Sequence, residues 1–224
     1  MKESASGFHL VNCPFITFMN KMHPGIVSLE EVCPGIIIQV DYSTIQNFTG
    51  EIVPGYKATK ALMAKSSAEA LARVQIKALS QELSLKIFDA YRPVKAVSFF
   101  QEWAKRPETN PEIRARYYPT FSRMDLFEKE FIAKQSSHSR GSAVDLTLVN
   151  LKTGKELDMG SIFDFFHETS HTDSPLITEE QRKNRTLLKT LMGGEGFRNF
   201  FQEWWHFSLR PEPFPNQSFD FDIE

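Results

Sequence analysis

Cysteine is scarce in this sequence, and long hydrophobic runs are missing. The 224 residues contain two cysteines, Cys13 and Cys33. Two cysteines in a chain of this size are typical of free thiols in a cytoplasmic protein, with a disulfide in an oxidising compartment as the alternative. No apolar run approaches the roughly 20 residues of a membrane helix, so we expect no membrane partner. Asn12, Pro14 and Asn20 interrupt the N-terminal stretch, which is unlike a secretory signal. We therefore expect a cytoplasmic protein, with the periplasm as the alternative.

A strong net charge is also absent. The chain has 26 Lys and Arg against 28 Asp and Glu, a formal charge of −2 at pH 7. This balance gives no electrostatic reason to expect nucleic acid or anionic lipid as a partner. Hydrophobic residues make up 41% of the chain, which is ordinary for a globular protein with a substantial core. With no internal repeat, the sequence predicts one domain over residues 30–224 behind an N-terminal extension, 1–29, of unknown role.

The order of the predicted elements favours an α+β fold. Strands are expected over residues 36–42, 85–91 and 144–149, which are rich in β-branched and other apolar residues. They do not alternate regularly with helices, as the strands of a doubly wound fold would. We therefore expect a single α+β domain.

Helices are expected at sequences typical of helix starts. Two capping-box patterns, Ser66-x-x-Glu69 and Thr178-x-x-Gln181, predict N-termini. Gly193 and Gly194 should end the second of these helices. Pro93 suits a first helical position, and one more helix is expected between residues 122 and 133.

Two distant stretches carry residue types that bind a catalytic metal. His138 and Asp145 belong to the first stretch, and Glu203 and His206 to the second. Two imidazoles and one carboxylate match the three protein ligands of a catalytic zinc, which leave one position for water. The spare carboxylate, Glu203, can take a proton from that water.

The spacing within each stretch predicts local turns. Seven extended residues would separate His138 from Asp145 by roughly 23 Å, whereas ligands of one zinc each lie within about 2 Å of it. The chain must fold back, and Gly141 can supply a positive φ there. Glu203 and His206 are three residues apart, so a flat strand would place them on opposite faces. A bend, a bulge or a helical turn is expected at that point.

These residues resemble a known family. The pattern Ser136-x-His138-x-x-Gly141-x-Ala143-x-Asp145, followed by Glu203-x-x-His206, is similar to that of the zinc D-Ala-D-Ala dipeptidases. The likeness runs from about Tyr42 to the C-terminus and includes residues 47–50, 89–93 and 213–216. The wider group of D,D-peptidases and Hedgehog-type domains shares the ligand spacing. The resemblance implies a mainly antiparallel sheet with flanking helices and one zinc ion per chain.

The resemblance also implies roles for individual residues. Its pattern makes His138, Asp145 and His206 the zinc ligands and Glu203 the general base. A fixed guanidinium at Arg92 would stabilise the oxyanion of the tetrahedral intermediate. The remaining positions hold the two ends of a dipeptide: Asp164 and Tyr42 the free ammonium group, and Ser136 the carboxylate.

Each role has a structural alternative. Arg92 could instead form an ion pair with Asp89, Asp164 could cap a turn, and Tyr42 could belong to the core. Trp204 and Trp205 are better suited to the pocket wall and the core than to a catalytic role. Phe207 stands beside His206 where the family can have a tyrosine, so a hydroxyl is missing there.

A second motif matches a zinc-binding pattern by coincidence, in our interpretation. Residues 167–171, His-Glu-Thr-Ser-His, satisfy the H-E-x-x-H pattern of zinc metalloproteases. That motif needs a helix through both histidines. Thr169 and Ser170 form helices poorly, and the Asp-Ser-Pro sequence at 173–175 interrupts the segment. We expect a loop there.

The sequence thus predicts a zinc enzyme that hydrolyses D-Ala-D-Ala to free D-alanine. The alternative is a zinc D,D- or L,D-carboxypeptidase that acts on longer peptidoglycan stem peptides. A third interpretation, a zinc-bearing binding module without turnover, is disfavoured by the presence of Glu203 and Arg92. The expected partner is a small dipeptide, and self-association into a homo-oligomer is left open.

Overall fold

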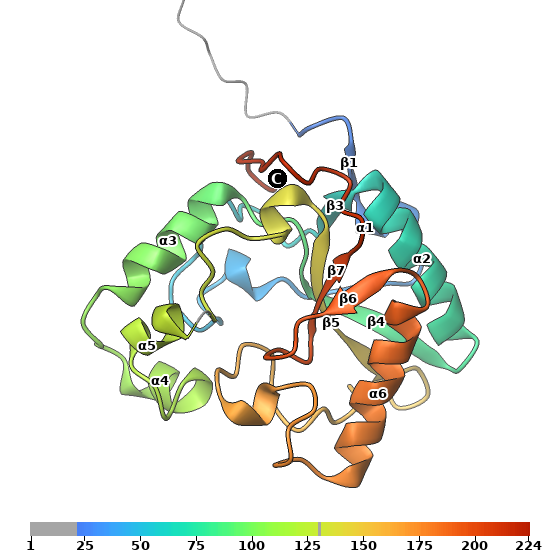
Figure 1. The fold of residues 1–224 in the computed structure, drawn as a ribbon. Coiled ribbons are helices and arrows are strands. Elements are labelled where there is room, and N and C mark those ends of the chain that lie inside the picture. The colour runs from blue at the N-terminus through green and yellow to red at the C-terminus, as the bar shows by residue number, and fades with distance from the viewer. Residues whose placement is uncertain (1–21, 130) are drawn as a thin grey trace, which may run out of the picture.

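A five-stranded sheet forms the centre of the molecule (Figure 1). The computed structural model describes residues 22–129 and 131–224. The strand order is β2-β4-β5-β7-β6, with β2 parallel to β4 and the other neighbours antiparallel. The strands are β2 (Ile37–Ile38), β4 (Leu83–Asp89), β5 (Ala143–Asn150), β6 (Phe197–Asn199) and β7 (His206–Leu209). This arrangement confirms the predicted α+β domain with a mainly antiparallel sheet.

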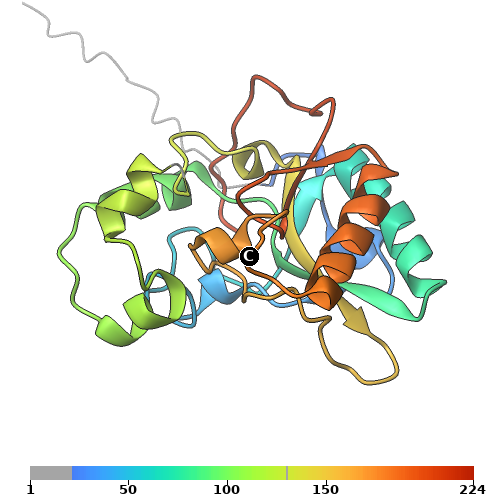
Figure 2. The same ribbon diagram turned by 60° about the horizontal axis from the view of Figure 1, so that its bottom comes forward.

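Helices lie on both sides of this sheet. The two long helices, α2 (Lys65–Leu79) and α6 (Glu179–Gly193), lie side by side on one side (Figures 1 and 2). The shorter helices α3 (Val94–Ala104), α4 (Pro111–Tyr117) and α5 (Arg123–Glu128) lie on the other side. No helix in the described part of the chain is both long and apolar enough to cross a membrane.

A second, two-stranded sheet lies at one end of the domain. It pairs β1 (Ile26–Ser28) with β3 (Leu62–Ala64), and the short helix α1 (Leu29–Val32) follows β1. Residues 1–21 lie outside the described part of the chain. The predicted N-terminal extension, residues 1–29, lies mostly among these residues and stays a prediction. So does pairing of Cys13 with Cys33, because Cys13 is among those residues.

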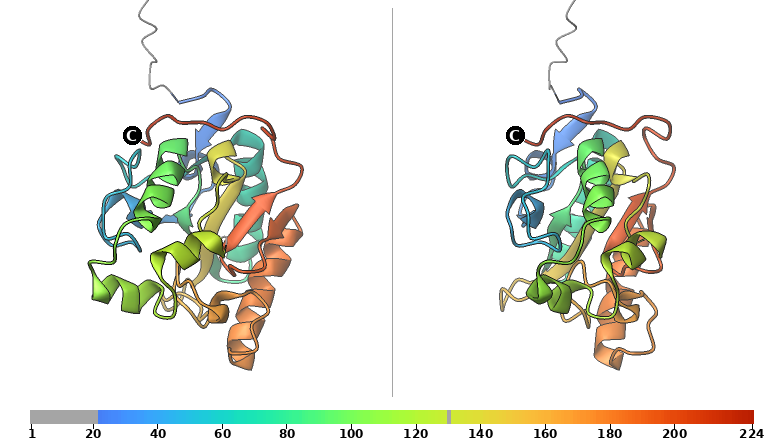
Figure 3. Two further views of the ribbon diagram at one scale, coloured as in Figure 1. Left: turned by 60° about the vertical axis from the view of Figure 1, so that its left-hand side comes forward. Right: turned by 90° about the vertical axis from the view of Figure 1, so that its left-hand side faces the viewer.

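The C-terminal segment crosses the same end of the molecule (Figure 3). The Phe219 N–H donates to the Ser139 carbonyl at 2.8 Å, and the Val94 N–H donates to the Phe219 carbonyl at 3.1 Å. Phe219, Phe221 and Ile223 are buried. The segment therefore holds the turn after His138 against the start of α3.

Three local predictions differ from the structure, the smallest being that Pro93 is the N-cap of α3 and not its first helical residue. The capping box at Ser66 does not form, because α2 already begins at Lys65 and Ala64 is its N-cap. The Lys65 N–H donates instead to the Gly25 carbonyl at 2.9 Å, so the end of β3 leads directly into the helix. The strand expected over 36–42 is reduced to β2, because the chain turns into the 3-10 helix η1 (Asp41–Ser43).

Other local predictions are confirmed. The Thr178 side chain accepts a hydrogen bond from the Gln181 N–H at 3.3 Å, and the Gln181 side chain accepts one from the Thr178 N–H at 2.9 Å. Gly194 is the C-cap of α6. Helix α5 lies within the expected range and begins with a capping box of Ser122 and Asp125.

Candidate active site

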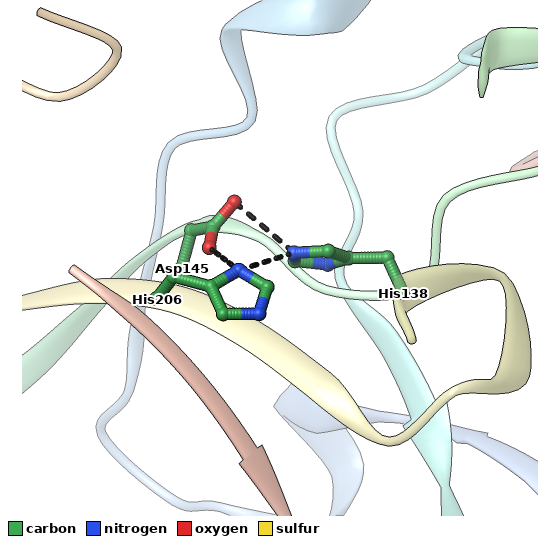
Figure 4. A group of neighbouring side chains, drawn as sticks. All are labelled: His138, Asp145 and His206. Carbon is green, nitrogen blue, oxygen red and sulfur yellow. Dashed lines mark hydrogen bonds and ion pairs between the residues drawn. The ribbon is translucent and has the colours of Figure 1, made fainter. Parts of the chain in front are cut away.

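The sheet and one tight turn bring the proposed metal ligands together (Figure 4). His138 begins the 3-10 helix η2 (His138–Arg140), and Gly141 follows it with φ +67°. A Cβ atom at Gly141 would lie 2.9 Å from the Ala64 backbone nitrogen, so both the conformation and the close approach require glycine. The chain then folds back into β5, where Asp145 is directly opposite His206 of β7. The predicted turn is confirmed.

The three ligand candidates fit a tetrahedral zinc. His138 Nε2 lies 3.2 Å from His206 Nδ1 and 3.3 Å from Asp145 Oδ2. His206 Nδ1 lies 3.0 Å from Asp145 Oδ1. A tetrahedral zinc with bonds of about 2.0–2.1 Å places its ligand atoms roughly 3.3 Å apart. The donor set and its spacing therefore suit the ion that the sequence predicts.

Hydrogen bonds outside this group orient both imidazoles. His138 Nδ1 lies 2.5 Å from the Ala90 carbonyl, which can only accept, so Nδ1 carries the proton and Nε2 presents its lone pair. His206 Nε2 lies 3.3 Å from Ser208 Oγ, so that Nδ1 faces His138 and Asp145. Burial opposes ionisation of Asp145, but the two imidazoles, when protonated, outweigh it and hold the pKa of this carboxyl well below its usual range.

Glu203 lies beside this group. The chain bends before β7, and the His206 N–H donates to the Glu203 carbonyl at 3.2 Å. The bend places both side chains on the site, with Glu203 Oε2 3.8 Å from His206 Nδ1. Burial, followed by the charges of Asp145 and Asp164, raises the pKa of Glu203 well above its usual range. A carboxyl group with a raised pKa is suited to accept and return a proton near neutral pH.

Arg92 is fixed by two carboxylates rather than exposed on the surface. Its Nε donates to Asp89 Oδ2 at 2.8 Å, and its Nη2 lies 3.3 Å from Asp145 Oδ2. Asp89 also accepts a hydrogen bond from the Tyr56 hydroxyl at 2.8 Å. The guanidinium lies 5.5 Å from the Tyr42 ring centre. Arg92 therefore forms the ion pair with Asp89 and also lies at the site.

A pocket of about 370 Å³ opens over these residues and is lined by all eight predicted site residues. Tyr42 and Asp164, which are 122 positions apart in the sequence, meet in it through a hydrogen bond of 2.8 Å. Burial raises the pKa of Asp164 well above its usual range, although the bond from Tyr42 opposes this shift. A cation nearby would favour its charged form.

The backbone of Asp164 is in an uncommon conformation. Its φ of +58° lies in the left-handed region, which non-glycine residues adopt with strain unless they are Asn or Asp. Ser136 Oγ, on the other hand, accepts a hydrogen bond from the His138 N–H at 3.2 Å, so it both lines the pocket and supports the turn.

The H-E-x-x-H segment is a loop, as expected. Residues Glu168–Ser170 form the single 3-10 turn η3, and His167 is its N-cap. The Thr169 N–H donates to His167 Nδ1 at 3.1 Å. No helix runs through both His167 and His171 in the described segment, so the two imidazoles do not share a helical face.

Several contacts at the site have no signal in the sequence. The Ala90 carbonyl and Ser208 orient the two histidines, but a backbone oxygen and a common serine are not recognisable from sequence. Phe207 is buried and paired with Val144 on β5. Strand alternation turns it away from the face of His206 and Ser208, so the missing hydroxyl lies off the metal site.

Comparisons with known proteins agree with this geometry. The model of the Peptidase M15 family, described as D-Ala-D-Ala dipeptidase, matches residues 22–224. The D-alanyl-D-alanine dipeptidase of Enterococcus faecium is 40% identical over 203 residues, which cover 91% of this chain and 100% of that protein. The protein of the same name from Enterococcus faecalis is 41% identical over 202 residues, covering 90% and 100%. That of Escherichia coli is 33% identical over 184 residues, covering 82% and 84%. The predicted resemblance is confirmed: the chain belongs to the Peptidase M15 family of D-Ala-D-Ala dipeptidases.

Proposed function

We propose that this protein is a zinc-dependent dipeptidase that hydrolyses D-Ala-D-Ala to two molecules of D-alanine. One observation carries the proposal. His138, Asp145 and His206 form a cluster that could hold a metal ion, and the buried carboxylate of Glu203 lies 3.8 Å from His206 Nδ1. Family membership supports the substrate.

His138, Asp145 and His206 would hold one zinc ion. When bound, zinc supplies a Lewis acid that activates water and polarises the peptide carbonyl. Glu203 accepts the proton that the attacking water loses. The same carboxyl group then delivers the proton to the nitrogen of the leaving D-alanine, so the peptide bond breaks and Glu203 returns to its starting state.

Arg92 would stabilise the negative charge that develops on the carbonyl oxygen. Its side chain lines the pocket, and Asp89 and Asp145 hold the guanidinium in one orientation. A donor that is already oriented needs no reorganisation during the reaction.

The two ends of the dipeptide would be bound separately. Asp164, supported by Tyr42, binds the free ammonium group, and Ser136 receives the carboxylate. An acylated amino terminus would leave Asp164 buried without a cation, which is costly. Longer stem peptides should therefore be poor substrates.

Release of D-alanine from D-Ala-D-Ala, compared with its N-acetyl derivative, tests this proposal. The zinc-loaded protein should hydrolyse the free dipeptide and lose activity to a chelator. Preference for the acetylated compound would favour the carboxypeptidase alternative. Absence of turnover with either compound, in protein that contains one zinc per chain, would exclude both hydrolases.

A further inference from the structure

Three arginines gather at one end of the pocket. Arg140, Arg198 and Arg210 all line it. Arg140 and Arg210 share one carboxylate: Arg140 Nη2 lies 3.0 Å from Glu212 Oε1, and Arg210 pairs with the same oxygen. Arg198 differs, because no carboxylate of residues 22–129 or 131–224 forms an ion pair with it. The three arginines and the one carboxylate of Glu212 therefore leave a net charge of +2 at this end.

The strand register places Arg198, an exposed residue, on the pocket side of β6. Arg198 of β6 is opposite Ser208 of β7, and paired residues of antiparallel strands share a face. Ser208 Oγ lies 2.9 Å from Ser137 Oγ, next to Ser136. The neighbouring residue Phe197 is buried, as alternation requires for the face toward α6.

The sheet order separates this end from the ammonium site. Tyr42 lies on the β4 side of the metal ligands, where its ring is 5.5 Å from Arg92. Arg198 lies on the edge strand β6, beyond β7. Asp145 and His206 are on β5 and β7, between the two. The pocket thus carries an acidic group on one side of the metal site and an unpaired guanidinium on the other.

We propose that Arg198 is a specificity-determining residue that binds the C-terminal carboxylate of the dipeptide. This inference rests on the proposed function. A serine hydroxyl at Ser136 offers one hydrogen bond and no charge, whereas a guanidinium offers charge and a planar pair of donors that match a carboxylate. Arg198 therefore selects substrates with a free C-terminus, while Asp164 selects those with a free N-terminus.

The test compares D-Ala-D-Ala with its C-terminal amide in wild type and Arg198→Met. The variant should lose roughly tenfold in kcat/KM for the acid, the order expected for a hydrogen bond to a charged group, mainly through KM. The amide should be affected little. Arg198→Lys should recover part of the preference for the acid over the amide. Arg114→Met, the same change at an exposed arginine outside the pocket, is the matched control.

Calorimetric binding of the acid and the amide to metal-free protein gives a readout that does not depend on turnover. Wild type should bind the acid more tightly, and Arg198→Met should reduce this preference, with an unchanged Tm. Equal binding of the two compounds by wild type, or an equal loss for both in the variant, would overturn the role of Arg198. Failure of zinc-loaded wild type to hydrolyse D-Ala-D-Ala would instead count against the proposed function, and the binding data would still decide the inference.

Discussion

Asp89 and Arg92 form a buried ion pair at the wall of the pocket, with Asp89 Oδ2 2.8 Å from Arg92 Nε. Asp89 is 1% exposed, and its other oxygen accepts from the Tyr56 hydroxyl. The carboxylate has no direct place among the metal ligands, since its nearest approach to His138 Nδ1 is 3.7 Å. Its effect on the reaction should therefore pass through the orientation of Arg92.

We expect Asp89→Asn to lower kcat about tenfold and Arg92→Met to lower it by about 10²-fold or more, as loss of an oxyanion donor does. The two changes should not add, because Asp89 acts through Arg92. In the Arg92→Met background, Asp89→Asn should cost little further activity. Steady-state kinetics of the four proteins, at equal zinc content, measures this. Fully additive losses would show that Asp89 contributes by another route.

Asp164→Asn tests the ammonium site without disturbing the backbone. Asparagine also tolerates the left-handed conformation found here, so the main change is the loss of charge. KM for D-Ala-D-Ala should rise by roughly tenfold, while kcat falls less. The penalty for N-acetylation of the substrate should shrink in the variant. An unchanged preference for the free amine would remove Asp164 from substrate recognition.

Removal of the metal should affect stability as well as turnover. A ligand that binds the folded state alone stabilises it by mass action. Without zinc, His138, Asp145 and His206 are left as a mostly buried cluster of polar groups. Chelation should therefore lower the Tm, and added zinc should restore both Tm and activity. His206→Ala should have a Tm that does not respond to a chelator; a full response would place the metal elsewhere.

The C-terminal segment should make the fold sensitive to acid. Lys57 Nζ and Lys95 Nζ each lie 2.7 Å from Asp222, and their hydrogen bonds lower the pKa of its carboxyl to about 2. Because this pKa is below the unfolded value of roughly 3.9, the ionised group contributes stability at neutral pH. That contribution is lost as the pH falls toward 2.

Asp222→Asn should therefore lower the Tm at pH 7, and the difference from wild type should narrow below roughly pH 4. Thermal unfolding between pH 7 and pH 2.5 measures it. Asp173→Asn is the matched control, since the Asp173 side chain is 82% exposed and lies 3.5 Å from Lys189. A difference that stays constant across this range would contradict the assignment.

The sequence predicted the site better than the elements around it, and the reason is physical. Metal ligation restricts residue types and spacing, and together with the family resemblance this restriction allowed His138, Asp145 and His206 to be named as one group. Gly141 and the bend before His206 followed from the same geometric demand. Ser66 failed as a cap because the hydrogen bond from Lys65 to Gly25 depends on tertiary contact. The helix Pro111–Tyr117 was not anticipated, although Asn110 caps it with its side chain.

Long-range contacts determine the features that local sequence patterns did not predict. The meeting of Tyr42 with Asp164 came from the family resemblance, since 122 positions separate them. The burial of the Asp89–Arg92 pair depends on Tyr56 and Asp145, which arrive from other strands and loops. Local patterns contain no information about such partners. The positive φ at Asp164 likewise depends on the loop that holds it.

The most direct test of the central claim is the turnover of D-Ala-D-Ala by Glu203→Gln with zinc measured in the same sample. We expect kcat to fall by about 10²–10⁴-fold, because the proton acceptor is lost. We also expect one zinc per chain in both proteins, since Glu203 lies next to the proposed ligands and is not one of them. A variant that keeps wild-type turnover with its zinc in place would contradict the proposed mechanism.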